Sequence, residues 1–84
     1  MDEYTIQILP SALKVLQKIP LKNRISIINR IERLALQPRP NGVVKLTGRN
    51  AYRVRQGDYR VIYTIKDNEL IVTVIKVAHR KDAY

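Results

Sequence analysis

The fold is decided by the stretch Tyr52-Arg53-Val54-Arg55-Gln56-Gly57-Asp58-Tyr59-Arg60-Val61-Ile62-Tyr63. β-Branched and aromatic residues alternate with arginines before Gly57-Asp58, and they dominate the run after it. Gly57-Asp58 has the length and composition of a two-residue hairpin turn. The stretch therefore predicts two antiparallel strands, Ala51 to Gln56 and Tyr59 to Lys66.

A two-residue turn also predicts the register of this hairpin. It pairs Gln56 with Tyr59, Arg55 with Arg60, Val54 with Val61 and Arg53 with Ile62. Arg53, Arg55 and Arg60 then share one face, and like charges directly opposite each other destabilise a sheet. A phosphate group would relieve this repulsion, because guanidinium donors match its oxygens. The alternative is a solvated sheet face whose arginines guard an edge against aggregation.

The rest of the chain predicts an α+β fold, with an N-terminal strand and an α-helical hairpin packed on a small, mainly antiparallel β-sheet. Residues 1–84 form a single domain. The expected strands are Thr5 to Leu9, Val43 to Leu46 as a weaker candidate, and Leu70 to Ala78; the expected helices are Ser11 to Lys18, with Ser11 as cap, and Leu21 to Gln37. Residues 38–42 read as a loop, and Asp67-Asn68 as a second two-residue turn.

Composition narrows the function. The 84 residues include 16 Lys and Arg against 7 Asp and Glu, a net charge of +9, and residues 38–65 alone hold six basic and one acidic residue. Such a concentration of one sign predicts a polyanionic partner. The absence of cysteine excludes disulfide and thiolate chemistry, and one histidine, His79, makes a metal site improbable. No apolar run is long enough to span a membrane, so we expect a cytoplasmic protein.

The C-terminal residues extend the basic face. The last strand runs back toward Tyr59 and Arg60, so we expect Arg80 to reach the same patch. Tyr84 offers a ring for base stacking and a phenol for proton transfer, or is simply a frayed terminal residue. His79 either flanks the site or packs at the strand end.

These residues resemble the RelE/ParE superfamily of toxins from toxin–antitoxin pairs, and the RelE branch in particular. The resemblance covers nearly the whole chain. It is carried by Leu46-Thr47-Gly48 with Tyr52-Arg53-Val54-Arg55, by Gly57-Asp58-Tyr59-Arg60-Val61-Ile62-Tyr63, and by Val77-Ala78-His79-Arg80-Lys81-Asp82-Ala83-Tyr84.

The resemblance implies an mRNA interferase, a metal-independent endoribonuclease that cleaves mRNA in the ribosomal A site and so inhibits translation. The ribose 2′-hydroxyl attacks the adjacent phosphate, and the protein needs no cofactor. The residues matching the family's catalytic positions are Arg55, Arg60, Arg80 and Tyr84; the expected RNA-binding residues are Arg53, Lys45, Arg49, His79 and Lys81. Arg60 would contact the scissile phosphate, Arg80 the leaving oxygen, and Tyr84 the base and the 2′-hydroxyl proton.

Two other functions fit the same fold. One is a ParE-like inhibitor of DNA gyrase without nuclease activity, and the other is a non-enzymatic RNA- or ribosome-binding module. In every case we expect a cognate acidic antitoxin that folds over the basic face, with DNA contacted only indirectly through that antitoxin. The outer side of the helical hairpin and the sheet edge are candidate docking surfaces.

Overall fold

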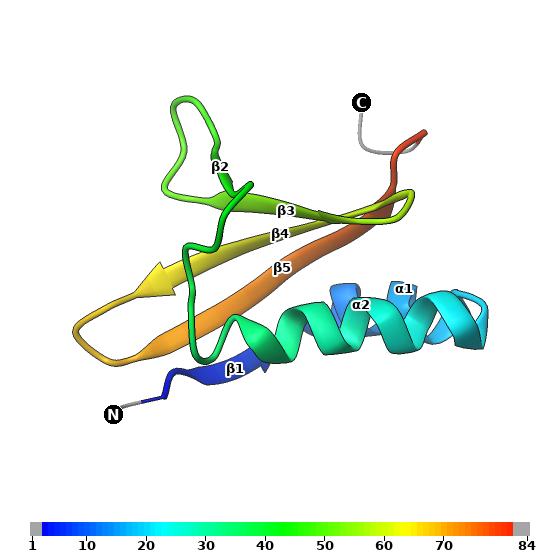
Figure 1. Cartoon of the computed structure of the whole chain (residues 1–84), viewed down its shortest axis with the longest axis horizontal. Helices are drawn as coiled ribbons and strands as arrows, with labels where there is room; N and C mark the ends of the chain where they lie inside the picture. The colour runs from blue at the N-terminus through cyan, green and yellow to red at the C-terminus, as the bar shows by residue number, and fades with distance from the viewer. Residues whose placement is uncertain (1–2, 82–84) are drawn as a thin grey trace.

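Two helices lie on one face of a five-stranded sheet (Figure 1). The computed structural model describes residues 3–81. The elements are β1 (Thr5–Ile8), α1 (Pro10–Lys18), α2 (Leu21–Arg33), β2 (Val44–Lys45), β3 (Tyr52–Gln56), β4 (Tyr59–Lys66) and β5 (Ile71–His79). This arrangement confirms the predicted α+β fold with its helical hairpin.

The sheet has the strand order β1-β5-β4-β3-β2. β1 is parallel to β5, and the remaining neighbours are antiparallel. The register predicted for the β3–β4 hairpin is confirmed, with Arg55 opposite Arg60 and Arg53 opposite Ile62. Gly57 has a φ of +59° at the first turn position, where a type II′ turn requires glycine.

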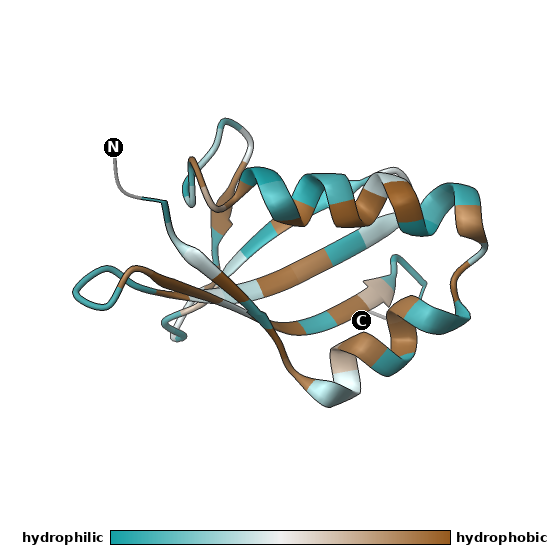
Figure 2. Cartoon of the chain, turned by 90° about the horizontal axis from the view of Figure 1, so that it is seen from below, coloured by the Kyte–Doolittle hydropathy of each residue, from teal (hydrophilic) through white to brown (hydrophobic). Residues whose placement is uncertain are grey.

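The core lies between the sheet and the helices. Because side chains alternate along a strand, Val54, Val61 and Tyr63 all point toward the helices, and all three are buried. They meet Leu16 of α1 and Ile27 of α2, and each fully buried aliphatic side chain contributes about 1.5–3 kcal/mol. Figure 2 shows the resulting alternation of hydrophobic and hydrophilic residues along the strands. Burial of this face leaves the opposite face of β3 and β4 to the arginines.

Both helices differ from their predicted bounds. α1 begins at Pro10, with Leu9 as N-cap and no side-chain cap, so the capping role expected of Ser11 was wrong. Proline suits the first helical position because its missing N–H would have no partner there. α2 ends at Arg33 rather than Gln37. After it the backbone tightens into i to i−3 hydrogen bonds, and the Ala35 carbonyl accepts a bond from the Tyr4 N–H instead (2.8 Å).

The second hairpin turn is longer than predicted. Lys66 pairs with Ile71, so the turn spans residues 67–70 rather than Asp67-Asn68 alone. Leu70 closes it with a φ of +54°, a left-handed conformation that a non-glycine residue seldom adopts. β5 therefore starts and ends one residue later than expected, at Ile71 and His79. The other strands lose a residue at one or both ends of their predicted ranges, except β4, which matches.

Candidate nucleic-acid-binding site

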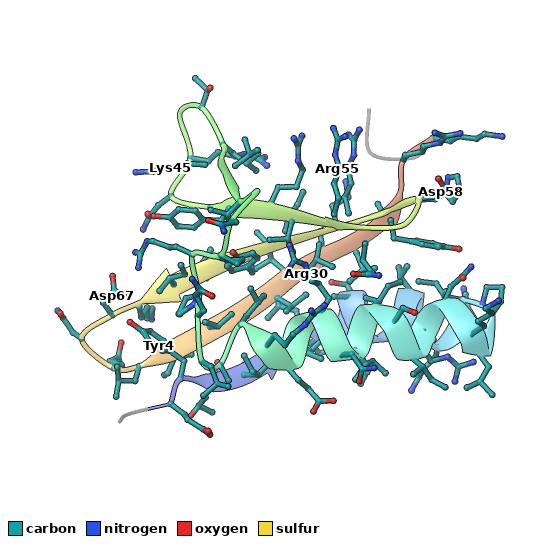
Figure 3. All side chains as sticks on the ribbon, in the orientation of Figure 1. Tyr4, Arg30, Lys45, Arg55, Asp58 and Asp67 are labelled. Carbon is teal, nitrogen blue, oxygen red and sulfur yellow. The ribbon has the colours of Figure 1, made fainter. Side chains whose placement is uncertain are left out.

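The three hairpin arginines share one sheet face, as predicted, and that face is turned away from the helices. Figure 3 shows Arg55 projecting from β3 on that side. Arg55 is exposed, Arg53 is half-buried, and Arg60 is only 8% exposed beside the buried Ala78 of β5. Arg60 is the one charged residue in the described range that is buried. β3, β4 and β5 contribute no carboxylate to this face, so it presents concentrated positive charge.

Arg80 is held at the end of the same hairpin. Its backbone N–H donates to the Asp58 carbonyl at 2.7 Å, and its Nε lies 3.8 Å from Asp58 Oδ1. Both side chains are more than half exposed, so this ion pair contributes little to stability. Its effect is positional, because it keeps the Arg80 guanidinium at the turn that follows Arg55 and precedes Arg60.

The remaining predicted residues do not all join this face. His79 pairs with Tyr59 on the helix-facing side, where the two rings meet edge to face with centroids 5.2 Å apart. Its Nδ1 accepts a hydrogen bond from the exposed Lys81 N–H (3.2 Å). Lys45 and Arg49 lie at the other end of β3, around the loop that joins it to β2. Tyr84 lies outside the described residues.

One further cation was missed by the sequence reasoning. Arg30 rises from α2 toward the sheet (Figure 3) and lines a cavity of about 430 Å³ together with Gly42, Val44, Arg53 and Arg55. Helical periodicity placed Arg30 off the apolar stripe but gave no sign of what it faces. Only the packing of α2 against β3 brings it to the arginines.

One acidic side chain, that of Asp67, is engaged away from the arginine face. Asp67, at the far end of β4 from Arg60, accepts two hydrogen bonds from the Arg39 guanidinium (3.0 and 3.1 Å) and one from the Tyr4 hydroxyl (2.7 Å). These bonds lower the pKa of Asp67 and raise that of Tyr4. The Arg39 guanidinium also lies over the Tyr52 ring, 5.2 Å from its centroid, which is a cation–π distance. This network joins the loop after α2 to the sheet. Because Asp67 is bound in it, its carboxylate does not neutralise the arginine face.

A buried tyrosine fixes the same loop from inside. The Tyr63 hydroxyl donates to the Pro38 carbonyl at 2.6 Å, and burial raises the pKa of Tyr63 to about 12. The loop leads directly into β2 and the cavity beside Arg53. The hydrogen bond ties the loop to the core through Tyr63.

Residues 3–81 offer neither a metal site nor a membrane-spanning helix. No group of three or more histidine, aspartate and glutamate side chains gathers there in a way that could hold a metal ion. No helix in that range is long and apolar enough to cross a membrane.

Comparison with known proteins identifies the family to which the chain belongs. Residues 6–84 match the family described as the ParE toxin of the type II toxin–antitoxin system parDE. The chain belongs to this family, within the RelE/ParE superfamily, and is a toxin of the type II toxin–antitoxin kind.

Individual relatives are RelE proteins. The chain is 30% identical to the putative toxin RelE1 of Methanocaldococcus jannaschii, over 98% of this chain and 96% of that one. The archaeal RelE–RelB complex from Pyrococcus horikoshii contains a chain of 30% identity with a TM-score of 0.85, covering 96% of this chain and 99% of that chain. The RelBE2 complex of Mycobacterium tuberculosis gives 26% identity and the same TM-score, with coverages of 98% and 97%.

Proposed function

We propose that this toxin is a ribosome-dependent mRNA endonuclease that acts without a metal ion. The observation that carries the proposal is the arginine face: Arg53, Arg55 and Arg60 share one side of the hairpin, and Asp58 holds Arg80 at its turn. Four guanidinium groups can bind the scissile phosphate and stabilise the negative charge that grows on it in the transition state. The ribosome would supply the ordered mRNA strand, which places the toxin in the cytoplasm.

The reaction is a transesterification. A base removes the proton of the ribose 2′-hydroxyl, the 2′-oxygen forms a bond to phosphorus, and the bond from phosphorus to the 5′-oxygen breaks. The products are a 2′,3′-cyclic phosphate and a 5′-hydroxyl. Arg60 binds the phosphate and Arg80 stabilises the leaving oxygen, which takes its proton from water because a guanidinium does not release one at neutral pH. We assign the role of the base to Tyr84, on the family resemblance alone.

The test is to map mRNA 5′ ends after adding the purified toxin to a defined translating ribosome. Cuts within the A-site codon are expected from the unmodified chain and from Arg33→Ala, which removes an exposed cation of α2 far from the face. Arg60→Ala and Tyr84→Ala should abolish them. Arg60 is buried, so its replacement could also disturb folding. Arg55 is exposed, and Arg55→Ala therefore serves as a second variant that should also reduce cleavage. Intact mRNA from folded, unmodified toxin would refute the proposal.

The match to the ParE family favours a second candidate function, inhibition of DNA gyrase. On this alternative the arginine face is a protein-docking surface and no RNA is cut. Purified toxin would then block supercoiling by gyrase and leave ribosome-bound mRNA intact. The two assays run on one preparation separate the candidates.

We also propose an acidic antitoxin as partner, supported by the solved complexes of similar RelE chains with RelB antitoxins. The outer side of α2 suits such a partner. Leu21 and Ile25 are 62% and 50% exposed, Ile28 continues the stripe, and Lys22 lies beside them. An amphipathic acidic helix would cover the apolar stripe and pair with its cations. DNA would be reached only through that antitoxin.

A further inference from the structure

The loop between α2 and β2 carries the dipeptide Asn41-Gly42, which has no part in the arginine face. The backbone N–H of Val43 donates to the Pro40 carbonyl at 3.1 Å and so closes a turn around the pair. Of the two central residues only Gly42 has a positive φ, +85°, which is the pattern of a type II turn. Both residues of the pair are exposed to solvent.

An asparagine followed by glycine can react with its own backbone. The backbone nitrogen of Gly42 forms a bond to Cγ of Asn41 and closes a five-membered ring. The bond from Cγ to Nδ2 breaks, and ammonia leaves with the hydrogen that the Gly42 nitrogen gives up. Water then opens this succinimide and returns a hydrogen to that nitrogen. Opening at Cγ gives aspartate, and opening at the main-chain carbonyl gives isoaspartate, so either product carries one new carboxylate.

The surroundings of the pair favour this attack. Glycine has no Cβ that would hinder its nitrogen. A Cβ built on Gly42 meets no atom within 4 Å, so the space around the turn is open. Among residues 3–81 no acceptor binds the backbone N–H of Gly42, so no hydrogen bond holds this nitrogen in place. The nucleophile is therefore accessible and unrestrained.

The turn has to open before the ring can close, because Asn41 must rotate its ψ away from the type II value. Within the described chain the hydrogen bond from Val43 to Pro40 is the one backbone bond that closes the turn. A single exposed bond of this kind shifts an equilibrium by about tenfold or less. Folding should therefore slow the reaction by no more than about tenfold relative to a short peptide of the same sequence.

Both ends of the loop are fixed independently of the turn. The Tyr63 hydroxyl holds the Pro38 carbonyl at 2.6 Å, and Val44 pairs with Arg53 in the sheet. A changed residue between these two anchors alters the loop locally and leaves the core contacts intact. The product is therefore expected to stay folded.

The new charge would arise next to the basic cluster. Gly42 lines the cavity of about 430 Å³ that is also lined by Arg30, Arg53 and Arg55. Residue 41 is its immediate neighbour, with Cα atoms about 3.8 Å apart. The Debye length is about 10 Å at 0.1 M salt, so a carboxylate at this position acts on anions bound to the cluster.

We propose that Asn41 is a site of spontaneous deamidation, and that the carboxylate formed there weakens the binding of a polyanion to the neighbouring arginines. The first part is independent of the proposed function, and the second rests on it for the choice of RNA as the polyanion. A unit negative charge about 10 Å from a bound phosphate lowers its affinity about twofold at the dielectric constant of water. The toxin would thus lose affinity for RNA as it ages.

The site is tested by incubating the purified full chain at neutral pH and mapping its peptides by mass spectrometry. Deamidation raises the mass by about one dalton, and an enzyme that methylates isoaspartate detects that product separately. Asn50 and Asn68 are internal controls, because they are also exposed but precede Ala51 and Glu69. Asn41 is expected to react first, within about tenfold of the rate in a synthetic peptide of residues 38–44.

The effect of the charge is tested with two matched variants. Asn41→Asp and Asn68→Asp each add one exposed carboxylate, but residue 68 lies in the turn between β4 and β5. The probe is a short single-stranded RNA that is 2′-O-methylated at every residue, so that it cannot be cut. Asn41→Asp should bind it about twofold more weakly than the unmodified chain, and Asn68→Asp should bind it equally well. Incubation should reproduce the loss in the unmodified chain but not in Asn41→Gln, whose side chain would have to close a six-membered ring.

The proposed site would be refuted if Asn41 reacts no faster than Asn50 and Asn68, or stays intact after the peptide has reacted fully. Equal RNA affinities of Asn41→Asp and Asn68→Asp would refute the proposed effect of the charge. Both measurements are independent of RNA cleavage, so a negative nuclease assay alters neither result.

Discussion

Replacing Arg55 by glutamine is expected to stabilise the fold while weakening its RNA site. The register places Arg55 directly opposite Arg60, with Cβ atoms about 5 Å apart. If the two guanidinium groups splay to about 8 Å, their repulsion is about 0.5 kcal/mol at the dielectric constant of water and about 2 kcal/mol at an effective value of 20. Arg55 is exposed, so we expect the lower figure.

A gain of about 0.5 kcal/mol raises the Tm of a domain of this size by about 2–4 °C. The assay is thermal unfolding of Arg55→Gln at low salt and at 1 M salt, with Arg33→Gln as control for the loss of one positive charge. At 1 M the Debye length is about 3 Å, so the gain should vanish. A variant less stable than the unmodified chain, or a gain that survives 1 M salt, would refute the idea that the arginine face is under electrostatic strain.

Three further predictions concern the frame of the site. Tyr63→Phe removes the 2.6 Å bond to Pro38 and should cost about 1–2 kcal/mol in denaturant unfolding. Because folding raises the pKa of Tyr63 to about 12, the unmodified chain should lose stability between about pH 10 and pH 12, and Tyr63→Phe should lose less over that range. The bonds from Arg39 lower the pKa of Asp67, so the stability that its carboxylate contributes is lost as the pH falls through that pKa. Asp67→Asn should therefore make the free energy of unfolding depend less on pH in the acid range. An unchanged dependence would contradict this prediction. Gly57→Val should cost about 1–3 kcal/mol because of the positive φ, and equal stability of the two chains would show that the turn relaxes.

The candidate site was predictable where it depends on neighbours in the chain. The two-residue turn and the alternation of Arg53, Val54 and Arg55 set the register and the shared face, and both were confirmed. The site was not predictable where the position of a side chain depends on its contacts with another element. His79 shares the strand end with Arg80, yet its pairing with Tyr59 turns it to the helix side.

The hairpin, the two helices and the concentration of positive charge in the central third of the chain could all be predicted from the sequence. These features follow from periodicity and turn chemistry, which act over a few residues. Three features became visible only in the folded chain: the parallel pairing of β1 with β5, the early end of α2, and the cavity that Arg30 shares with Arg53. The reason is that burial and hydrogen-bond satisfaction act between segments far apart in the sequence, and no local pattern records which partners they select.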